Sequence, residues 1–269
     1  MSLLLRAGTW DEVTPESAGW EHLSFSVVDV AGPRSFDLGE REVAIVPLSG
    51  EATVRAGGTA WTVGRESMWV ERPQSLYLPR DTPFEVDGRA QLALSCAVAR
   101  TRREPVLIPP EAVEIEIRGA GNATRQISHI VKPEFPADRI LVVEVYTPAG
   151  NWSSYPPHKH DEERGELETI LEETYYFRSR PGAAGAFAVQ RLYSPAHGLD
   201  LTETVRDGDL LLVPYGYHTT AAAHGYDLYY LNALAGNRRS MQPADDPELA
   251  WVRPAWETLE PDPRVPMVT

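Results

Sequence analysis

The chain has 269 residues, of which 42% are hydrophobic, so it can form one large or two modest domains with sizeable cores. Its formal net charge of −14 argues against nucleic-acid binding, which usually needs a basic surface, and offers no attraction to an anionic membrane. An anionic small molecule would have to be held by local cations, because the field of the whole protein repels it.

The cysteine content and the first ten residues indicate in which cellular compartment the protein is found. The single cysteine, Cys96, excludes an intramolecular disulfide and indicates a reducing environment. The opening MSLLLRAGTW lacks the long apolar stretch and the cleavage site of a signal peptide. No apolar run approaches the roughly 18 residues that a membrane-spanning helix needs. We therefore expect a soluble cytoplasmic protein with no membrane partner.

The first half of the chain reads as short strands separated by turns. The predicted strands are rich in β-branched residues or alternate between apolar and polar ones, and AGP, LSG, AGG and RDTP punctuate them. They lie at residues 24–30, 41–48, 51–56, 60–63, 75–79, 91–99 and 114–117. This spacing predicts an all-β sandwich or barrel.

The same pattern starts again at residue 139. The second set of predicted strands lies at residues 139–148, 173–179, 186–193, 201–214, 218–223 and 226–236. The 23 prolines and 20 glycines disfavour long helices. We expect only short helices, with one near residues 244–251, where PADDPELAW offers acidic first-turn residues.

The two halves resemble each other weakly, which favours an internal duplication. The strand–turn–strand at residues 41–58 is loosely matched by residues 172–193. The stretch SLYLPRDTPFEV parallels LLLVPYGYHTTAA, which aligns Pro79 with Pro214. We place the join near Gly119, giving predicted domains at residues 1–118 and 119–269.

Histidines are distributed unevenly between these halves. His22 is the only one before residue 129. The others are His129, His158, His160, His197, His218 and His224. A histidine-based metal site can therefore belong only to the second half, and the first half reads as a scaffold.

The segment from residue 153 to residue 177, SSYPPHKHDEERGELETILEETYYF, concentrates residues that can bind a metal. In an extended strand, residues two apart point to the same side, so His158 and His160 would share a face. Glu173 and Tyr175 would do the same on the strand ETYYF, and His218 follows the turn VPYGY. Three imidazoles and a carboxylate suit a divalent ion such as zinc, manganese or iron(II).

Plainer interpretations exist for the same residues. A His-x-His pair on an exposed strand is often solvated surface. The acidic run DEERGELE between His160 and Glu173 reads most simply as a solvated, mobile loop, and otherwise as a lid over a barrel mouth. Because this loop is long, three other carboxylates compete with Glu173 as the ligand. They are Glu166, Glu168 and Glu172.

Four stretches resemble the two metal motifs of the cupin superfamily: GNWSSYPPHKHDE, LEETYYF, RDGDLLLVPYGYH and GYDLYYLNALAG. More narrowly, the chain resembles the 5-deoxy-glucuronate isomerases of bacterial myo-inositol catabolism and their relative, 4-deoxy-5-keto-uronate isomerase. GWEHLSF and IPPEAVEIEIRGAGNATRQI extend the likeness over nearly the whole sequence.

The resemblance implies an all-β bicupin, that is, two tandem cupin barrels of the double-stranded β-helix or jelly-roll type. Residues 1–118 would form an N-terminal cupin-like barrel without a metal site, and residues 119–269 a C-terminal barrel with one metal. The implied ligands are His158, His160, Glu173 and His218. Glu173 is preferred because ETYYF aligns with a glutamate-led strand of the relative. Ala222 departs from the motif, which has asparagine there.

The implied activity is an aldose–ketose isomerisation of 5-deoxy-D-glucuronate to 2-deoxy-5-keto-D-gluconate. It requires a Lewis acid, for which zinc is the first choice, a base that moves a proton between adjacent carbons, and a cation for the substrate carboxylate. Candidates for the base are Glu172, Tyr175, Tyr229 and a metal-bound hydroxide. Candidates for the substrate contacts are Arg191, Lys132, Arg125 and Gln190, with Gln190 and Arg191 facing opposite ways on their strand.

Three other functions compete with this interpretation. They are a 4-deoxy-5-keto-uronate isomerase, an iron-dependent cupin dioxygenase and a sugar-binding or storage bicupin without turnover. We also expect a homo-oligomer, a dimer or larger, because exposed sheet edges need covering.

Overall fold

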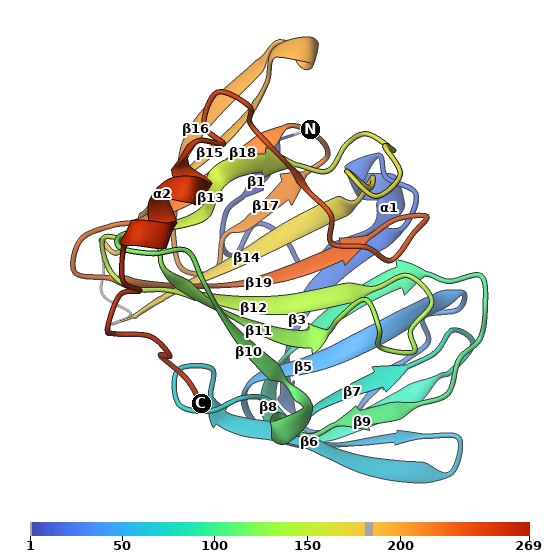
Figure 1. Cartoon of the computed structure of the whole chain (residues 1–269). Coiled ribbons are helices and arrows are strands. Elements are labelled where there is room, and N and C mark those ends of the chain that lie inside the picture. Colours follow the sequence, from blue (N-terminus) through green and yellow to red (C-terminus); the bar gives the residue numbers. More distant parts are fainter. Residues whose placement is uncertain (1, 181–184) are drawn as a thin grey trace.

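The computed structural model describes residues 2–180 and 185–269, and these residues form three antiparallel sheets (Figure 1). The described helices are short. They are α1 (Pro15–Ala18), α2 (Val252–Ala255) and the 3-10 turns η1 (Pro110–Ala112), η2 (Pro195–His197) and η3 (Trp256–Thr258). None of the described helices has the length and apolar character needed to cross a bilayer.

An eight-stranded sheet makes up the first half, in the order β2-β3-β8-β5-β7-β9, with β4 on β8 and β6 on β5. Its strands are β2 (Glu12–Val13), β3 (Leu23–Ala31), β4 (Arg34–Phe36), β5 (Arg41–Ala56), β6 (Thr59–Ser67), β7 (Ser75–Leu78), β8 (Phe84–Val98) and β9 (Val106–Ile108). The long strands β5 and β8 run through the whole half and curl its sheet around an apolar core of its own.

Two sheets make up the second half. The seven-stranded sheet has the order β1 (Leu4–Leu5), β17 (Leu210–Val213), β14 (Glu172–Arg180), β19 (Asp227–Ala235), β12 (Leu141–Thr147), β11 (Arg125–Val131) and β10 (Glu114–Arg118). The five-stranded sheet has the order β16 (Leu199–Val205), β15 (Ala188–Ser194), β18 (Tyr217–Ala222), β13 (Trp152–Lys159) and β20 (Ala244–Asp245). A second apolar core lies between these two sheets.

The observed elements include the predicted strands, with several differences. The predicted strands at residues 41–48 and 51–56 form the single strand β5, and β9 and β11 were not predicted. Residues 201–214 form two strands, β16 and β17, because the turn around Gly208 (φ +81°) separates them. The helix expected at residues 244–251 is wrong: Ala244 and Asp245 pair with β13, and the helix α2 begins only at residue 252. Strand β10 pairs with β11, and β1 near the N-terminus pairs with β17, so both strands belong to the seven-stranded sheet although they lie within residues 1–118.

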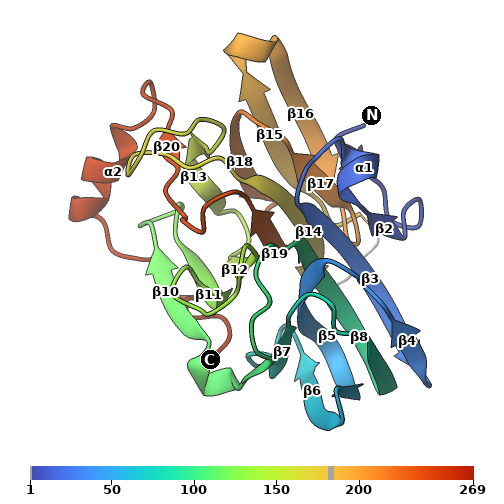
Figure 2. The ribbon, with the colours of Figure 1, turned by 90° about the vertical axis from the view of Figure 1, so that its right-hand side faces the viewer.

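The halves pack against each other through a shared core, and Figure 2 shows the sheets of the two halves side by side. Buried residues of β3, β5 and β8 meet buried residues of β12 and β19 there, with Phe25 and Tyr146 among the larger ones. A fully buried ion pair crosses this core from Arg65 on β6 to Glu144 on β12, and the hydroxyl of Tyr229 donates to the same carboxylate at 2.8 Å.

Two glutamates, the buried Glu42 and the partly buried Glu172, link the halves in a reciprocal way. Glu42, at the start of β5, accepts hydrogen bonds from the backbone N–H groups of residues 138, 139 and 140, at 2.8, 2.6 and 2.7 Å, just before β12 begins. Glu172, at the start of β14, accepts from the N–H groups of residues 21, 22 and 23, at 2.7, 3.0 and 2.8 Å, where β3 begins. Equivalent carboxylates thus cap equivalent strands of the opposite half, which supports the predicted duplication.

We expect Glu42→Gln to destabilise the fold. The amide would turn an N–H group toward backbone donors, and leaving such buried groups unsatisfied costs about 2–3 kcal/mol of unfolding free energy. The matched control is Glu40→Gln, because the Glu40 side chain is 73% exposed and bonds only to Arg80 at the surface. Exposed pairs of this kind contribute about 0–1 kcal/mol. Urea-unfolding midpoints of the two variants measure the difference, and equal midpoints would contradict the role of Glu42.

Candidate metal centre

The candidate ligands lie where β13, β14 and β18 meet. His158, near the end of β13, is directly opposite His218 on β18 in the strand register. His160 directly follows the last residue of β13, and Glu173 is the second residue of β14. The alternation predicted for β14 is observed, because Glu173 and Tyr175 face the cavity between the sheets, whereas Glu172 faces the first half.

Three of these side chains converge on one point. The Nε2 atom of His160 is 2.8 Å from Oε2 of Glu173, and the Nε2 atom of His218 is 3.2 Å from the same oxygen. One ligand atom from each of the three residues lies within 4.8 Å of the others. All three side chains are buried, and His218 is fully inaccessible. The fourth expected ligand, His158, lies beside this cluster, with its ring centroid 4.6 Å from that of His218.

Backbone carbonyls orient the imidazole rings. In each histidine the Nδ1 atom faces a main-chain oxygen, so Nδ1 can donate and the lone pair is left on Nε2. The contacts are His160 to Leu171 O (2.9 Å), His218 to Gly216 O (3.1 Å) and, more weakly, His158 to Pro156 O (3.4 Å).

A divalent metal fits this arrangement. Although it is close to Glu173, the buried Nε2 atom of His218 has no hydrogen-bond partner with acceptable geometry among the described residues. A buried polar atom without a partner is costly, and a metal ion at the centre of the cluster would satisfy it. The donor set of imidazole nitrogens and one carboxylate suits zinc, manganese or iron(II).

The protonation of the cluster follows from burial and mutual contact. Burial alone would raise the pKa of Glu173, but the hydrogen bond with His160 and the close imidazoles of His160 and His218 outweigh it and hold the pKa at about 2. Burial and the neighbouring His218 lower the pKa of His158 well below its ordinary value. For His160, burial opposes protonation, but the contact with Glu173 outweighs it and raises the pKa. Metal ligation requires a neutral imidazole beside a carboxylate anion, so a binding metal would displace this proton.

Comparison with known proteins assigns the chain to a family. The profile of the KduI/IolB family matches residues 5–252. The 5-deoxy-glucuronate isomerase of Geobacillus kaustophilus is 41% identical over 247 residues, which is 89% of each chain. The 5-deoxy-glucuronate isomerase of Bacillus subtilis strain 168 is 37% identical over 249 residues, 90% of this chain and 91% of that protein.

The chain belongs to the KduI/IolB family.

Solved structures agree with this membership in the KduI/IolB family. An IolB-like protein from Salmonella typhimurium superposes with a TM-score of 0.89 at 35% identity, covering 94% of this chain and all of that one. The oxalate decarboxylase of Lactobacillus farciminis superposes with a TM-score of 0.61 at 13% identity, covering 87% of this chain and 82% of that one, and shows the fold alone. These matches confirm the all-β cupin fold predicted from the sequence.

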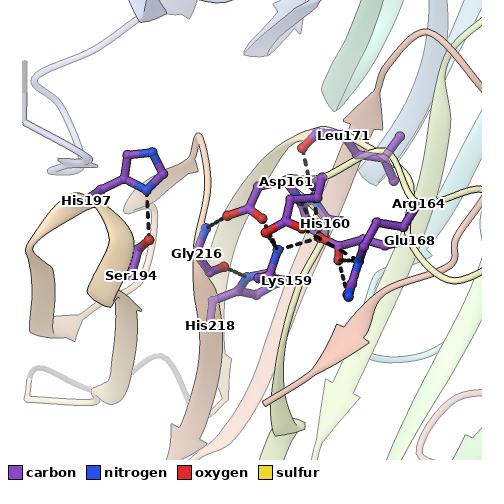
Figure 3. A network of polar contacts seen from close by, with 11 residues as sticks. Lys159, His160, Asp161, Arg164, Glu168, Leu171, Ser194, His197, Gly216 and His218 are labelled. Carbon is purple, nitrogen blue, oxygen red and sulfur yellow. Dashed lines mark hydrogen bonds and ion pairs between the residues drawn. The ribbon is translucent and has the colours of Figure 1, made fainter. Parts of the chain in front are cut away.

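The long loop of this KduI/IolB chain between His160 and β14 is anchored. Glu168 is fully buried and accepts hydrogen bonds from Lys159 Nζ (2.9 Å), Arg164 Nε (2.9 Å) and the backbone N–H groups of residues 161 and 162 (Figure 3). Asp161 accepts from the backbone N–H of Gly216 at 2.8 Å, which ties the loop to the turn before His218. The interpretation of the whole acidic run as solvated therefore fails at Glu168, which supports the loop instead of competing for the metal.

Of the three side chains predicted as the base, only Tyr175 lines the cavity. Its hydroxyl lies 3.1 Å from Oγ of Ser154, and burial raises its pKa well above the ordinary value. Glu172 is bonded to the start of β3, and Tyr229 is bonded to Glu144 in the core between the halves. These contacts give Glu172 and Tyr229 structural roles away from the metal cluster.

The predicted substrate contacts are dispersed. Arg191 forms an exposed ion pair with Asp200, because it points outward on β15, and Lys132 forms one with Glu114 at 2.9 Å. Gln190 is buried and bonds to Thr220, but it is not among the residues that line the metal cavity. The cationic side chains that do line it beside the histidines are Arg118 and Arg125.

Sequence reasoning missed several residues of the cavity wall. They include Arg118, Ser154, Tyr230, Asn232 and Gln242. Strand alternation could have found two of them, because Tyr230 and Asn232 share a face of β19 while Tyr229 points to the opposite one. Ser154 has a positive φ of 50°, a local backbone feature for which the sequence gives no signal.

Substitutions of the two adjacent glutamates of β14 should have different effects, one on metal binding and the other on stability. We expect Glu173→Gln to release the metal, because it removes the negative charge at the centre of the cluster. Glu172→Gln should keep the metal but lower the unfolding midpoint, because Glu172 holds three backbone N–H groups of the first half. Elemental analysis after gel filtration and urea unfolding measure the two effects. Loss of metal in Glu172→Gln with retention in Glu173→Gln would contradict the register.

Proposed function

We propose that the chain is a 5-deoxy-glucuronate isomerase, which converts 5-deoxy-D-glucuronate to 2-deoxy-5-keto-D-gluconate in myo-inositol catabolism. The observation that carries the proposal is the convergence of His160, Glu173 and His218 at one cavity, which His160 and Glu173 line. Relatives named 5-deoxy-glucuronate isomerase align with this chain over about nine-tenths of their length. The reaction moves a hydrogen from the hydroxyl-bearing carbon to the neighbouring aldehyde carbon, with no net redox change.

The metal would be held by His160, Glu173 and His218, with His158 as the fourth ligand. Zinc is the ion that we propose, and manganese and iron(II) are the alternatives that this donor set accepts. When bound, such an ion would polarise the aldehyde and stabilise negative charge on the oxygen atoms of the reacting pair of carbons.

A group of hydroxyls lines the same cavity as the ligands. Oγ of Ser154 lies 3.1 Å from the hydroxyl of Tyr175 and 3.2 Å from that of Tyr230. Burial raises the pKa of both tyrosines, so at neutral pH they are protonated and can donate hydrogen bonds to a substrate oxygen. We propose that Tyr175, with Ser154 orienting its hydroxyl, donates its proton to the aldehyde oxygen and regains one from the neighbouring hydroxyl group of the sugar.

The walls of the cavity limit the access of water. Ile127, Val143, Val145 and Leu234 contribute apolar side chains to the lining, and Leu171 closes the end near His160. Apolar walls around a polar centre lower the local dielectric constant, which strengthens each charge interaction there. They also protect a reactive intermediate from the solvent.

The competing functions can be distinguished by the substrate, the metal dependence and the turnover that each would show. A dioxygenase would consume oxygen and depend on iron, and the likeness to the oxalate decarboxylases, at 13% identity, carries the fold and no activity. A storage protein would bind a sugar without turnover. A 4-deoxy-5-keto-uronate isomerase would require a different sugar acid, whereas the curated relatives named here are 5-deoxy-glucuronate isomerases.

We expect product formed in deuterated water to carry some deuterium on the carbon that was the aldehyde, because a proton held on an exchangeable acid–base group is partly replaced by deuterium before it is returned. Proton NMR identifies the product and the deuterium together. His218→Ala should abolish turnover by loosening the metal, and the control His224→Ala should be silent because His224 is exposed. Metal-replete protein that does not convert this sugar would defeat the proposal, and product free of deuterium would indicate a hydride shift or a shielded base.

A further inference from the structure

Arg125, at the start of β11, is a buried arginine without an acidic partner. Its side chain is only 3% exposed, and no carboxylate among the described residues lies within ion-pair distance of it. Its Nη1 atom donates to the carbonyl oxygens of Ala123 (3.1 Å) and Tyr155 (3.2 Å). Burial lowers its pKa to about 10, so the guanidinium remains charged at neutral pH.

A buried charge without a counter-ion is costly, and proteins normally pair it. The fully buried Arg65 follows this rule, since it is bonded to Glu144. Arg125 has only carbonyl partners on Nη1, and its Nε and Nη2 atoms have no hydrogen-bond partner among the residues that the structure describes. These free donors indicate a place for an anion that arrives from outside the chain.

The candidate anion site at Arg125 belongs to the same cavity as the candidate metal ligands. Arg125 lines the same cavity as His158, His160 and Glu173. The backbone packs tightly beside it: Gly119 has a φ of +80°, and a Cβ atom there would lie 2.1 Å from the carbonyl oxygen of Ala123, to which Arg125 donates, and 2.9 Å from Nη1 of Arg125. The ring of Trp256 covers the guanidinium on another side, with the Cζ atom 5.8 Å from the ring centre.

The other arginine of the cavity is already neutralised. Arg118 forms two parallel hydrogen bonds with Glu116, at 2.7 and 2.8 Å, and His129 binds the same carboxylate at 2.9 Å. Within the described lining, Arg125 is therefore the arginine whose charge is uncompensated. The chain as a whole carries a net charge of −14, so a buried local cation is what an anionic ligand needs here.

We propose that Arg125 is the carboxylate subsite of the cavity: its guanidinium binds the carboxylate of the sugar acid while the aldehyde end reaches the metal cluster. This inference rests on the proposed function and adds the residue that selects the substrate class. Arginine presents planar paired donors that match a carboxylate, and such charge-assisted bonds are strong in a dry site. A neutral sugar leaves the guanidinium unpaired and is rejected for that reason.

The test compares two sugars that differ only at this end, 5-deoxy-D-glucuronate and 5-deoxy-D-glucose, in which a hydroxymethyl group replaces the carboxylate. We expect the wild-type protein to prefer the acid strongly. In Arg125→Met, kcat/KM for the acid should fall on the order of 10²-fold, mainly through KM, while the neutral sugar is little affected. Arg125→Lys should recover part of the preference because it restores the charge.

Controls separate this effect from damage to the fold or the metal centre. Metal content and unfolding midpoint should match those of the wild type in both Arg125 variants. The surface control Arg34→Met should leave both sugars unaffected, because Arg34 is exposed on β4 of the first half. If Arg125→Met does not fold, Arg125→Lys and the preference of the wild-type protein decide the question.

The outcomes distinguish this inference from the proposed function. Turnover of both sugars with equal kcat/KM by the wild-type protein would overturn the carboxylate subsite and leave isomerase activity standing. Retention of the preference in Arg125→Met, or its loss in Arg191→Met instead, would overturn the assignment to Arg125. A wild-type protein that converts neither sugar would overturn the proposed function and this inference with it.

Discussion

Glu172 and Glu173 are neighbours at the start of β14, and strand geometry sends their side chains to opposite faces. Glu173 enters the cavity and joins two imidazoles, while Glu172 crosses to the first half and binds the backbone where β3 begins. The metal cluster and the packing of the halves thus depend on the register of one strand. A shift by one residue would place Glu172 in the cavity and leave the other half uncapped.

Among the described residues, the candidate metal cluster lies wholly in the second half. The contacts of Glu172 nevertheless give the first half a role in positioning the strands around it. Glu42 makes the reciprocal contact to that of Glu172, and the buried Arg65–Glu144 pair also links the two halves. These bonds fix β12 and β14, and β12 and β19 lie between β14 and β11, the strand that begins with Arg125. The first half acts as a support that keeps the walls of the cavity in place.

Much of this could be predicted from the sequence, because strand alternation and histidine placement are local signals. They located many of the strands, the half of the chain that holds the candidate ligands, the grouping of His160, Glu173 and His218, and the opposite facing of Glu172. What sequence could not supply were the long-range contacts. Nothing local shows that Glu172 binds residues 21–23, that Tyr229 turns to Glu144, or that Arg191 pairs with Asp200 at the surface. The importance of Arg125 likewise depends on the absence of a nearby carboxylate, which only the folded arrangement reveals.

The most direct test of the central claim is anomalous diffraction from crystals of the metal-loaded protein, recorded on both sides of the absorption edge of the ion. The predicted result is one anomalous peak per chain, about 2.0–2.2 Å from the Nε2 atoms of His160 and His218 and from a carboxylate oxygen of Glu173. His158 should complete this set. A peak within the first half, or none beside Glu173 in protein that carries a full equivalent of metal, would contradict the account.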